Sequence, residues 1–159
     1  MGHSSEQMNR FWKAAKIKLD QHQCAPISSL MTSEVITLDR TSTLKDALRL
    51  FREHSLRHLV VVDEQKQVQG VFTKRDLLGV EGGGLDRSIV SVVNDTVLTA
   101  RKTACVREVA QTLLERKIGC VPIVEQGAGK EVLVGIVTEA DFVRAFALTT
   151  RCSCGAMNA

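Results

Sequence analysis

The sequence lacks the features that would place it in a membrane or on nucleic acid. It has no apolar run near the roughly 20 residues of a spanning helix and no charged-then-apolar signal segment at its start. Its net charge of +3 is too small to indicate binding to nucleic acid or to a membrane surface. These absences predict a cytoplasmic protein.

Signatures of catalysis are also missing. There is no phosphate loop of the Walker type, no H-E-x-x-H metal motif and no Ser-His-Asp arrangement. No second His or Cys stands at ligand spacing from His58, so a metal role for it is not expected. The sequence therefore predicts a protein that is not an enzyme and needs no metal.

The five cysteines are odd in number, which agrees with a reduced, cytoplasmic protein. Cys105 and Cys120 fall in apolar patterns, where we expect free thiols to pack. Cys152 and Cys154 form a lone C-x-C pair that could bind metal with a partner chain or form a disulfide. A solvated tail over residues 149–159 is the preferred interpretation.

The most informative feature of the sequence is an internal duplication. Three segments recur 62 positions later: Met31–Leu38 as Val93–Ala100, Thr43–Phe51 as Cys105–Leu113, and Leu59–Asp63 as Val121–Glu125. Gly70–Asp76 recurs 65 positions later as Gly135–Asp141, because the Gly-rich loop 126–130 is longer than its counterpart. A constant offset broken once at a loop predicts two copies of one folding unit.

Both copies show the same predicted order of strand, helix, strand, strand and helix. The first has strands at 35–38, 59–62 and 68–73, a helix after Thr43 with Asp46 as its capping box, and a second helix from Asp76. The second has strands at 96–99, 121–124 and 133–137, a helix lined by Val106, Val109, Ala110 and Leu113, and a closing helix from Asp141. Pro122 is expected where its strand lies at an edge or an opening. One copy alone would expose too much apolar sheet, so the two should pack with pseudo-twofold symmetry.

These patterns divide the chain into four parts. Residues 1–26 form a helical extension, 27–82 the first repeat, 83–148 the second repeat and 149–159 the flexible tail. The extension has apolar residues at helical spacing: Met8, Phe11, Trp12, Ala15 and Leu19. This amphipathic helix is expected to pack on the core or on a second subunit rather than to anchor the protein to a membrane or nucleic acid.

The repeated corners Thr73-x-x-Asp76 and Thr138-x-x-Asp141 are the candidate functional motif. Each follows a strand and opens a helix, so each could serve only as a cap of that helix. However, both copies have Asp where a capping box prefers Glu or Gln, and both have Gly three residues before the Thr. A short carboxylate fixed at a helix start can accept hydrogen bonds from the two hydroxyls of a ribose. This arrangement favours two matched ligand clefts.

Over residues 27–148 the sequence resembles a tandem pair of CBS domains, named after cystathionine β-synthase. The resemblance rests on Gly-Val-Phe-Thr-x-x-Asp at 70–76, Gly-Ile-Val-Thr-x-x-Asp at 135–141 and the segments Arg57–Asp63 and Lys117–Val124. It implies an α/β (α+β) fold of two packed β-α-β-β-α repeats and a homodimer of pairs. It also implies clefts for an adenosine ligand such as AMP, ADP, ATP, S-adenosylmethionine or NAD. The ligand-binding residues it implies are Thr138, Asp141, Arg57, His58, Val97, Val121, Pro122, Thr73, Asp76, Ile36, Val60 and Lys117.

The two expected clefts differ in charge. Arg57 and His58 precede the buried strand of the first repeat, whereas Gly119 and Cys120 hold those places in the second. By the resemblance, a phosphorylated ligand should prefer the Thr138–Asp141 cleft, with Arg57 and His58 reaching across. Lys74 and Arg75 could serve a phosphate in the other cleft, and a merely solvated strand start remains open for Arg57 and His58.

Two functions follow from this sequence. The first is a regulatory protein that stands alone, binds an adenosine ligand between its repeats and transmits this to an unknown regulated protein. The second is a dimeric interaction scaffold that needs no ligand and uses the N-terminal helix to hold a partner.

Overall fold

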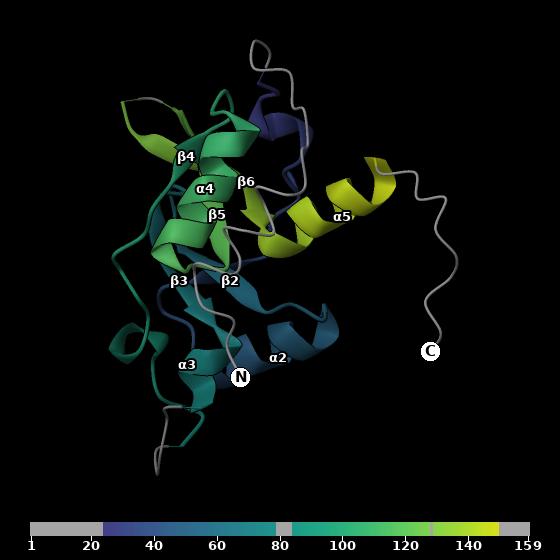
Figure 1. Cartoon of the computed structure of the whole chain (residues 1–159). Helices are drawn as coiled ribbons and strands as arrows, with labels where there is room; N and C mark the ends of the chain where they lie inside the picture. Colours follow the sequence, from purple (N-terminus) through teal and green to yellow (C-terminus); the bar gives the residue numbers. More distant parts are fainter. Residues whose placement is uncertain (1–23, 79–83, 128, 150–159) are drawn as a thin grey trace, which may run out of the picture.

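The computed structural model describes residues 24–78, 84–127 and 129–149 (Figure 1). The predicted N-terminal amphipathic helix and the Cys152–Cys154 tail lie outside the described residues. Within the described ranges, none of the helices has the length and apolar character that crossing a membrane would require.

Each repeat contains the predicted order of strand, helix, strand, strand and helix, preceded by a short 3-10 turn. The first repeat consists of η1 (Ile27–Ser29), β1 (Thr37–Asp39), α2 (Leu44–Glu53), β2 (His58–Val62), β3 (Val68–Thr73) and α3 (Lys74–Leu78). The second consists of η2 (Ile89–Ser91), β4 (Ala100–Arg101), α4 (Val106–Arg116), β5 (Cys120–Gln126), β6 (Glu131–Thr138) and α5 (Glu139–Thr149). The predicted fold class is confirmed.

The strands form two three-stranded sheets, in the order β1-β2-β3 and β4-β5-β6. In both sheets the first strand runs parallel to the central one and the third runs antiparallel to it. Because β4 pairs only with Ile123 and Val124, β5 has a sheet neighbour on one side alone at Pro122. The missing N–H of this proline therefore costs no ladder bond to β4, as its predicted place at an opening requires.

One predicted strand was wrong. Residues 96–99 are not in a strand, and the first strand of the second repeat is the short β4 at Ala100–Arg101. The β-branched run before β4 instead lies along the opposite repeat, where Asn94 forms an isolated bridge with Val71. In the first repeat, likewise, the strand begins at Thr37, two residues later than predicted.

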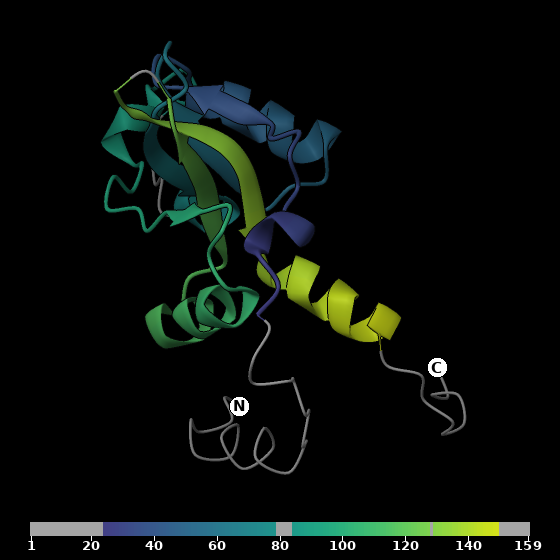
Figure 2. The same cartoon turned by 90° about the horizontal axis from the view of Figure 1, so that it is seen from above.

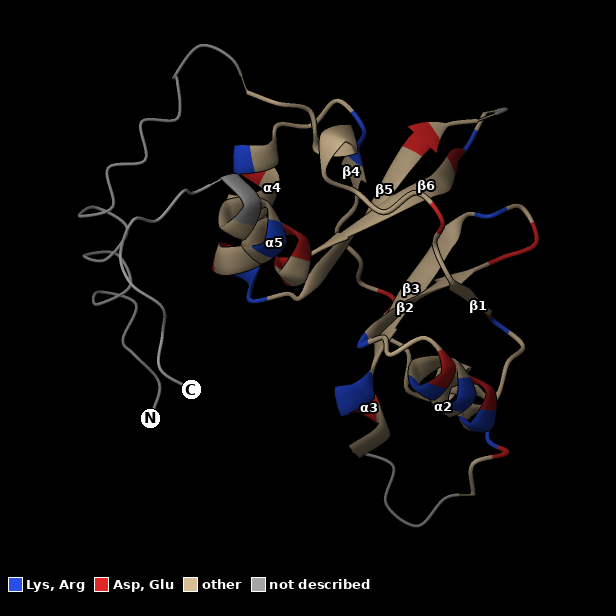
Figure 3. Ribbon diagram, turned by 90° about the vertical axis from the view of Figure 1, so that its right-hand side faces the viewer, with Lys and Arg blue, Asp and Glu red and all other residues tan. Residues whose placement is uncertain are grey.

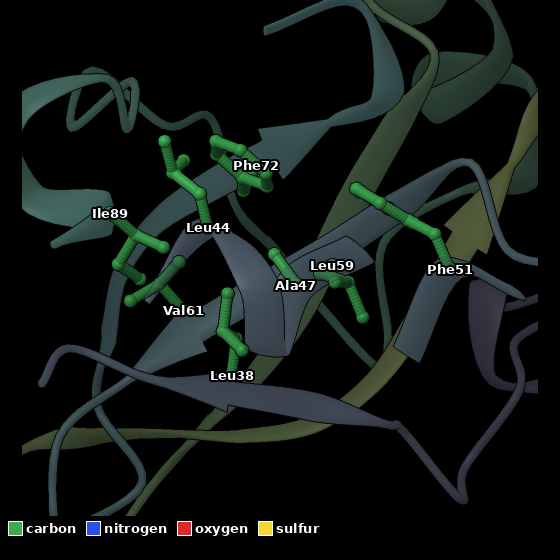
Figure 4. Packing of buried hydrophobic residues seen from close by; sticks show 8 residues of the cluster. All are labelled: Leu38, Leu44, Ala47, Phe51, Leu59, Val61, Phe72 and Ile89. Atoms are coloured by element: carbon green, nitrogen blue, oxygen red, sulfur yellow. The ribbon is translucent and has the colours of Figure 1, made fainter. Parts of the chain in front are cut away.

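The first repeat has a compact core between its sheet and α2 (Figure 4). Leu44, Ala47 and Phe51 of α2 are fully buried, and Phe51 stacks on Phe72 with ring centroids 5.9 Å apart. Burial of each such large apolar side chain stabilises the fold by about 1.5–3 kcal/mol. The predicted capping box is also present, because the Thr43 hydroxyl accepts from the Asp46 N–H and the Asp46 carboxylate accepts from the Thr43 N–H.

The two repeats exchange their leading segments. Ile27, which opens the first repeat, is fully buried in the core of the second, and Ile89, which opens the second, is fully buried in the core of the first. The backbone contacts match: Ile27 N–H donates to Ala104 O at 2.8 Å, and Ile89 N–H donates to Ser42 O at 3.1 Å. Figures 1 and 2 both show the purple η1 segment beside the second repeat. Neither repeat therefore completes its core without the other.

The exchange explains the glycines that precede the two corners. A Cβ on Gly70 would lie 2.9 Å from the carbonyl oxygen of Asn94, and one on Gly135 would lie 2.6 Å from Sδ of Met31. Each glycine thus makes room for the segment that crosses from the other repeat. These glycines have a structural reason that requires no ligand.

The cysteines behave differently from prediction at one position. Cys105 is not a free thiol but forms a disulfide with Cys24, 81 positions earlier, with the two Cα atoms 5.5 Å apart. The exchanged leading segment brings these residues together, which an apolar pattern around Cys105 cannot reveal. Cys120 is a buried free thiol as predicted, and burial raises its pKa to about 12.

Candidate functional site

Both Thr-x-x-Asp corners are closed by hydrogen bonds within the chain. Oδ2 of Asp76 accepts from the Thr73 N–H at 2.6 Å and from its hydroxyl at 2.8 Å. Oδ2 of Asp141 accepts from the same two groups of Thr138, both at 2.8 Å. One oxygen of each carboxylate therefore acts at the start of a helix, as the capping interpretation expects.

The second oxygens of the two carboxylates differ. Oδ1 of Asp141 accepts from Nη1 of Arg144 at 3.0 Å, and the residue is only 7% exposed. Asp76 is half-buried, and among the described residues its Oδ1 has no hydrogen-bond donor. Asp76 consequently keeps one acceptor that a ligand hydroxyl could use.

The start of each corner helix is attached to the start of a central strand. Lys74 N–H donates to Arg57 O, and Glu139 N–H donates to Gly119 O, both at 3.2 Å. These bonds place the Thr73–Asp76 corner beside the basic end of β2. They bring together side chains that are 17 positions apart in the sequence.

A cavity of about 530 Å³ opens at this corner. Its walls come from both repeats: the start of β2, the end of β3 with α3, the segment before β4, the turn from α4 into β5, and the first residue of α5. The lining residues are Arg57, His58, Val71, Thr73, Lys74, Arg75, Asp76, Asn94, Thr96, Val97, Leu98, Lys117, Ile118, Gly119, Cys120 and Glu139. A volume of this size falls in the range of small-molecule sites.

Positive charge predominates around the cavity. Four side chains that are cationic at neutral pH line it, against two carboxylates: Arg57, Lys74, Arg75 and Lys117 against Asp76 and Glu139. Figure 3 shows Lys and Arg in blue at the start of α3. This balance favours an anionic ligand.

Lys117 is held in an unusual backbone conformation. It caps the C-terminus of α4 with a φ of 54°, in the left-handed region that glycine usually occupies. A non-glycine residue there costs about 1 kcal/mol or more. The matched residue of the first repeat, Ser55, has a φ of 53°. The helix ends are thus alike, but only the second provides a cation.

His58 packs against the backbone of the second repeat. A Cβ on Gly119 would collide with its imidazole ring, so the glycine makes room for the histidine. Burial lowers the pKa of His58 from its usual 6.5, and the nearby Arg57 lowers it further. The imidazole is therefore neutral at pH 7 and can both donate and accept a hydrogen bond.

The structure brings half of the predicted site residues together. Arg57, His58, Thr73, Asp76, Val97 and Lys117 line the cavity. The other predicted residues are outside its lining: Ile36, Val60, Val121, Pro122, Thr138 and Asp141. Val60, Val121 and Pro122 are buried within the sheets. Arg57 and His58 were expected to serve the Thr138–Asp141 corner, but they line the cavity of the other one.

Several lining residues escaped the sequence-based prediction. Asn94, Thr96, Leu98, Ile118 and Glu139 were not named. The repeat offset could have found Leu98, because it matches Ile36, which was named. The same reasoning applies to Glu139, which matches Lys74 at the offset of 65, and Lys74 was named. Among the described residues, no three His, Cys, Asp or Glu side chains gather in a way that could hold a metal ion.

Comparison with known proteins identifies the class. The model of the CBS domain matches residues 27–83 and again 89–148. The chain belongs to the CBS domain family and carries two CBS domains in tandem.

Solved structures and curated relatives agree with this membership. The crystal structure of AcuB from Vibrio cholerae, named as an acetoin utilization protein, is 33% identical in sequence to this chain and has a TM-score of 0.71. The match covers 79% of this chain and 93% of AcuB. Hypoxic response protein 1 from Mycobacterium tuberculosis is 28% identical over 72% of this chain and 80% of its own length. The CBS domain pair of protein MJ0100, solved with 5′-methylthioadenosine and S-adenosyl-L-methionine, is 24% identical with a TM-score of 0.72, over 80% of this chain and all of that one.

Other relatives are much longer than this chain. It spans 45% of a Methanocaldococcus jannaschii protein that is 27% identical, and 26% of the L-aspartate semialdehyde sulfurtransferase from Methanosarcina acetivorans, which is 25% identical. The chain therefore spans less than half the length of these two relatives.

Proposed function

We propose that the chain is a regulatory module that binds a phosphorylated adenosine compound in the cavity at Thr73 and Asp76. The observation that carries the proposal is the union, in one 530 Å³ cavity, of a carboxylate at a helix start and four cationic side chains. The carboxylate suits the sugar of a nucleotide, and the cations suit its phosphates.

The sugar would be held by Asp76. Its Oδ2 is engaged by Thr73, which fixes the carboxylate and leaves Oδ1 to accept from a ribose hydroxyl. The apolar side chains of Val71, Val97 and Ile118 provide walls for a purine ring. A pocket with apolar walls and a few fixed polar groups is typical of small-molecule sites.

The phosphates would be held by the cations of both repeats. Arg57, Lys74 and Arg75 come from the first repeat, and Lys117 comes from the second. A ligand that contacts all four would bridge the repeats. This choice of cleft reverses the preference drawn from the sequence, and the Thr138–Asp141 corner remains a second candidate because it has the same Thr and Asp.

The ligands of two structural neighbours support an adenosine compound. The MJ0100 pair was solved with 5′-methylthioadenosine and S-adenosyl-L-methionine, and the structure of CBSX2 was solved with AMP. The positive charge of this cavity favours AMP, ADP or ATP over S-adenosylmethionine, whose sulfonium is cationic. No catalytic group is needed for this role, and we propose that the chain is not an enzyme.

Regulation would follow from the bridging position of the ligand. Its presence changes the relative placement of the repeats only to the extent that it binds one arrangement more tightly than another. We propose that a homodimer of this chain passes that change to a regulated protein.

A thermal-shift and calorimetric comparison tests the proposal. Millimolar AMP, ADP or ATP should raise Tm, because a ligand that binds only the folded state stabilises it by mass action. Asp76→Asn should abolish the ligand-induced shift, while Asp141→Asn, which disturbs the matched cap, should keep it. Lys117→Ala should weaken the binding of AMP and leave the binding of adenosine unchanged. No shift with any adenosine compound would refute the proposal, and a loss confined to Asp141→Asn would move the site to the other corner.

The alternative is a scaffold that needs no ligand, and the closed corners favour it. Both aspartates already serve as helix caps within the chain. A chain shortened by residues 1–23 separates the two functions, because it should lose partner capture but retain nucleotide binding. Mass spectrometry of small molecules released from the purified protein gives an independent answer.

A further inference from the structure

The junction between the leading segment and the second repeat holds a disulfide that the proposed function does not use. Cys24 is exposed and Cys105 is half-buried at the N-cap of α4. Around them, Val106 N–H donates to Ala25 O at 3.0 Å, and Pro26 forms an antiparallel bridge with Cys105. The bond therefore ties the chain, at the edge of the described residues, to the start of a helix in the opposite repeat.

The pseudo-twofold symmetry supplies a matched junction without a disulfide. There, Leu44 N–H donates to Arg87 O at 2.9 Å, and Thr43 forms the bridge with Ser88. Thr43 closes its helix with a capping box, whereas Cys105 makes no side-chain cap bond. The second junction thus has a disulfide at the position where the first has a hydrogen-bonded helix cap.

This position suits thiol–disulfide exchange. The exposed Sγ of Cys24 can be attacked by an external thiolate, and Cys105 then leaves as a thiolate at the N-terminus of α4. The first-turn N–H groups and the dipole of an 11-residue helix favour a negative charge there. A stabilised leaving thiolate speeds exchange.

We propose that Cys24 and Cys105 are a reversible redox pair that controls the attachment of the N-terminal segment to the second repeat. A dithiol reductant transfers two electrons and two protons: its first thiolate forms a mixed disulfide with Cys24, and its second thiol resolves it. The products are two cysteine thiols and the disulfide of the reductant. In the reduced form residues 24–26 detach from the second repeat, while Ile27 stays in the core.

The ligand cavity should not respond to this reaction. Neither cysteine lines it, and neither does any residue of the leading segment 24–32. The redox pair is therefore a second input, independent of the nucleotide. A negative result for the redox pair would therefore leave the proposed nucleotide binding unaffected, and the reverse also holds.

Amide hydrogen exchange of the full chain with and without dithiothreitol tests the proposal. Reduction should speed exchange at least tenfold at the Val106 N–H, which faces Ala25, but leave the matched Leu44 N–H unchanged. It should also lower Tm by at least about 5 °C, since the bond closes a long loop. Cys24→Ser should behave like the reduced protein and be insensitive to dithiothreitol. A Cys152→Ser/Cys154→Ser variant should respond as the wild type does.

Three outcomes would overturn the proposal. The first is a peptide map of the oxidised protein that contains no bond between Cys24 and Cys105. The native protein could resist millimolar dithiothreitol, which would make the bond a static link. Equal exchange rates at Val106 in both forms would show that the bond controls nothing.

Discussion

Gly70→Ala tests whether the crossing of the two repeats is as tight as the structure indicates. The added Cβ would lie 2.9 Å from Asn94 O and 3.2 Å from both methyl groups of Val93. The nearest atom is backbone, which cannot move aside as a flexible side chain would. Such overpacking costs about 1–3 kcal/mol.

An opposing term reduces this cost. Replacing glycine by alanine stabilises the folded state by about 0.4–1 kcal/mol, because the unfolded chain loses freedom. The net loss of stability should be about 1–2 kcal/mol, equivalent to a fall in Tm of about 2–8 °C for a chain of this size. Calorimetry and urea unfolding both measure it.

Two further glycines serve as controls. In Gly135→Ala the added Cβ would lie 2.6 Å from Sδ of Met31. Because the Met31 side chain is flexible, the loss of stability should be smaller than in Gly70→Ala. Gly84→Ala meets nothing within 4 Å and should leave the stability unchanged or slightly higher. If Gly70→Ala were as stable as Gly84→Ala, the close crossing would be refuted.

Three further changes have defined outcomes. Ile27→Ala should lower the free energy of unfolding, measured with urea, by about 2–4 kcal/mol, and Ile89→Ala by a similar amount. Each variant removes a fully buried side chain from the core of the opposite repeat. An Ile27→Ala variant as stable as the wild type would refute the exchange of leading segments. Thr43→Ala should lower the free energy of unfolding by about 1 kcal/mol, because it removes the N-cap of α2. Loss of helical structure in an element other than α2 would contradict this. The pKa of His58 is lower in the folded state than its usual value of 6.5, so the unfolded state binds more protons. The stability should therefore fall as the pH drops below 6.5. His58→Gln should reduce that pH dependence in Tm scans, and an unchanged slope would count against the buried histidine.

Local signals in the sequence predicted most of the fold. The capping box at Thr43, the apolar run of β2 and the duplicated corners each depend on neighbours within a few residues. Such patterns report the period of an element and the place where it starts. They predicted the order of elements in both repeats.

The long-range features could not be predicted in this way. The burial of Ile27 in the second repeat leaves no trace in periodicity, because an apolar residue looks the same whichever core receives it. The same exchange brings Cys24 to Cys105, so their disulfide could not be predicted from local patterns. It also places residues 96–98, which were predicted as part of a strand, in the wall of the cavity. The side of the molecule that Arg57 and His58 face also depends on how the repeats pack.

The exchanged segments connect the fold to the proposed function. The stretch that crosses Gly70 at Asn94 continues directly into Thr96, Val97 and Leu98, which line the cavity. Any ligand there would therefore touch the same segment that fixes the second repeat on the first. Such a ligand can alter the packing of the repeats only if it binds one arrangement of that segment better than another. Gly70→Ala, which displaces the segment at Asn94, should accordingly weaken nucleotide binding more than Gly135→Ala, although neither glycine lines the cavity.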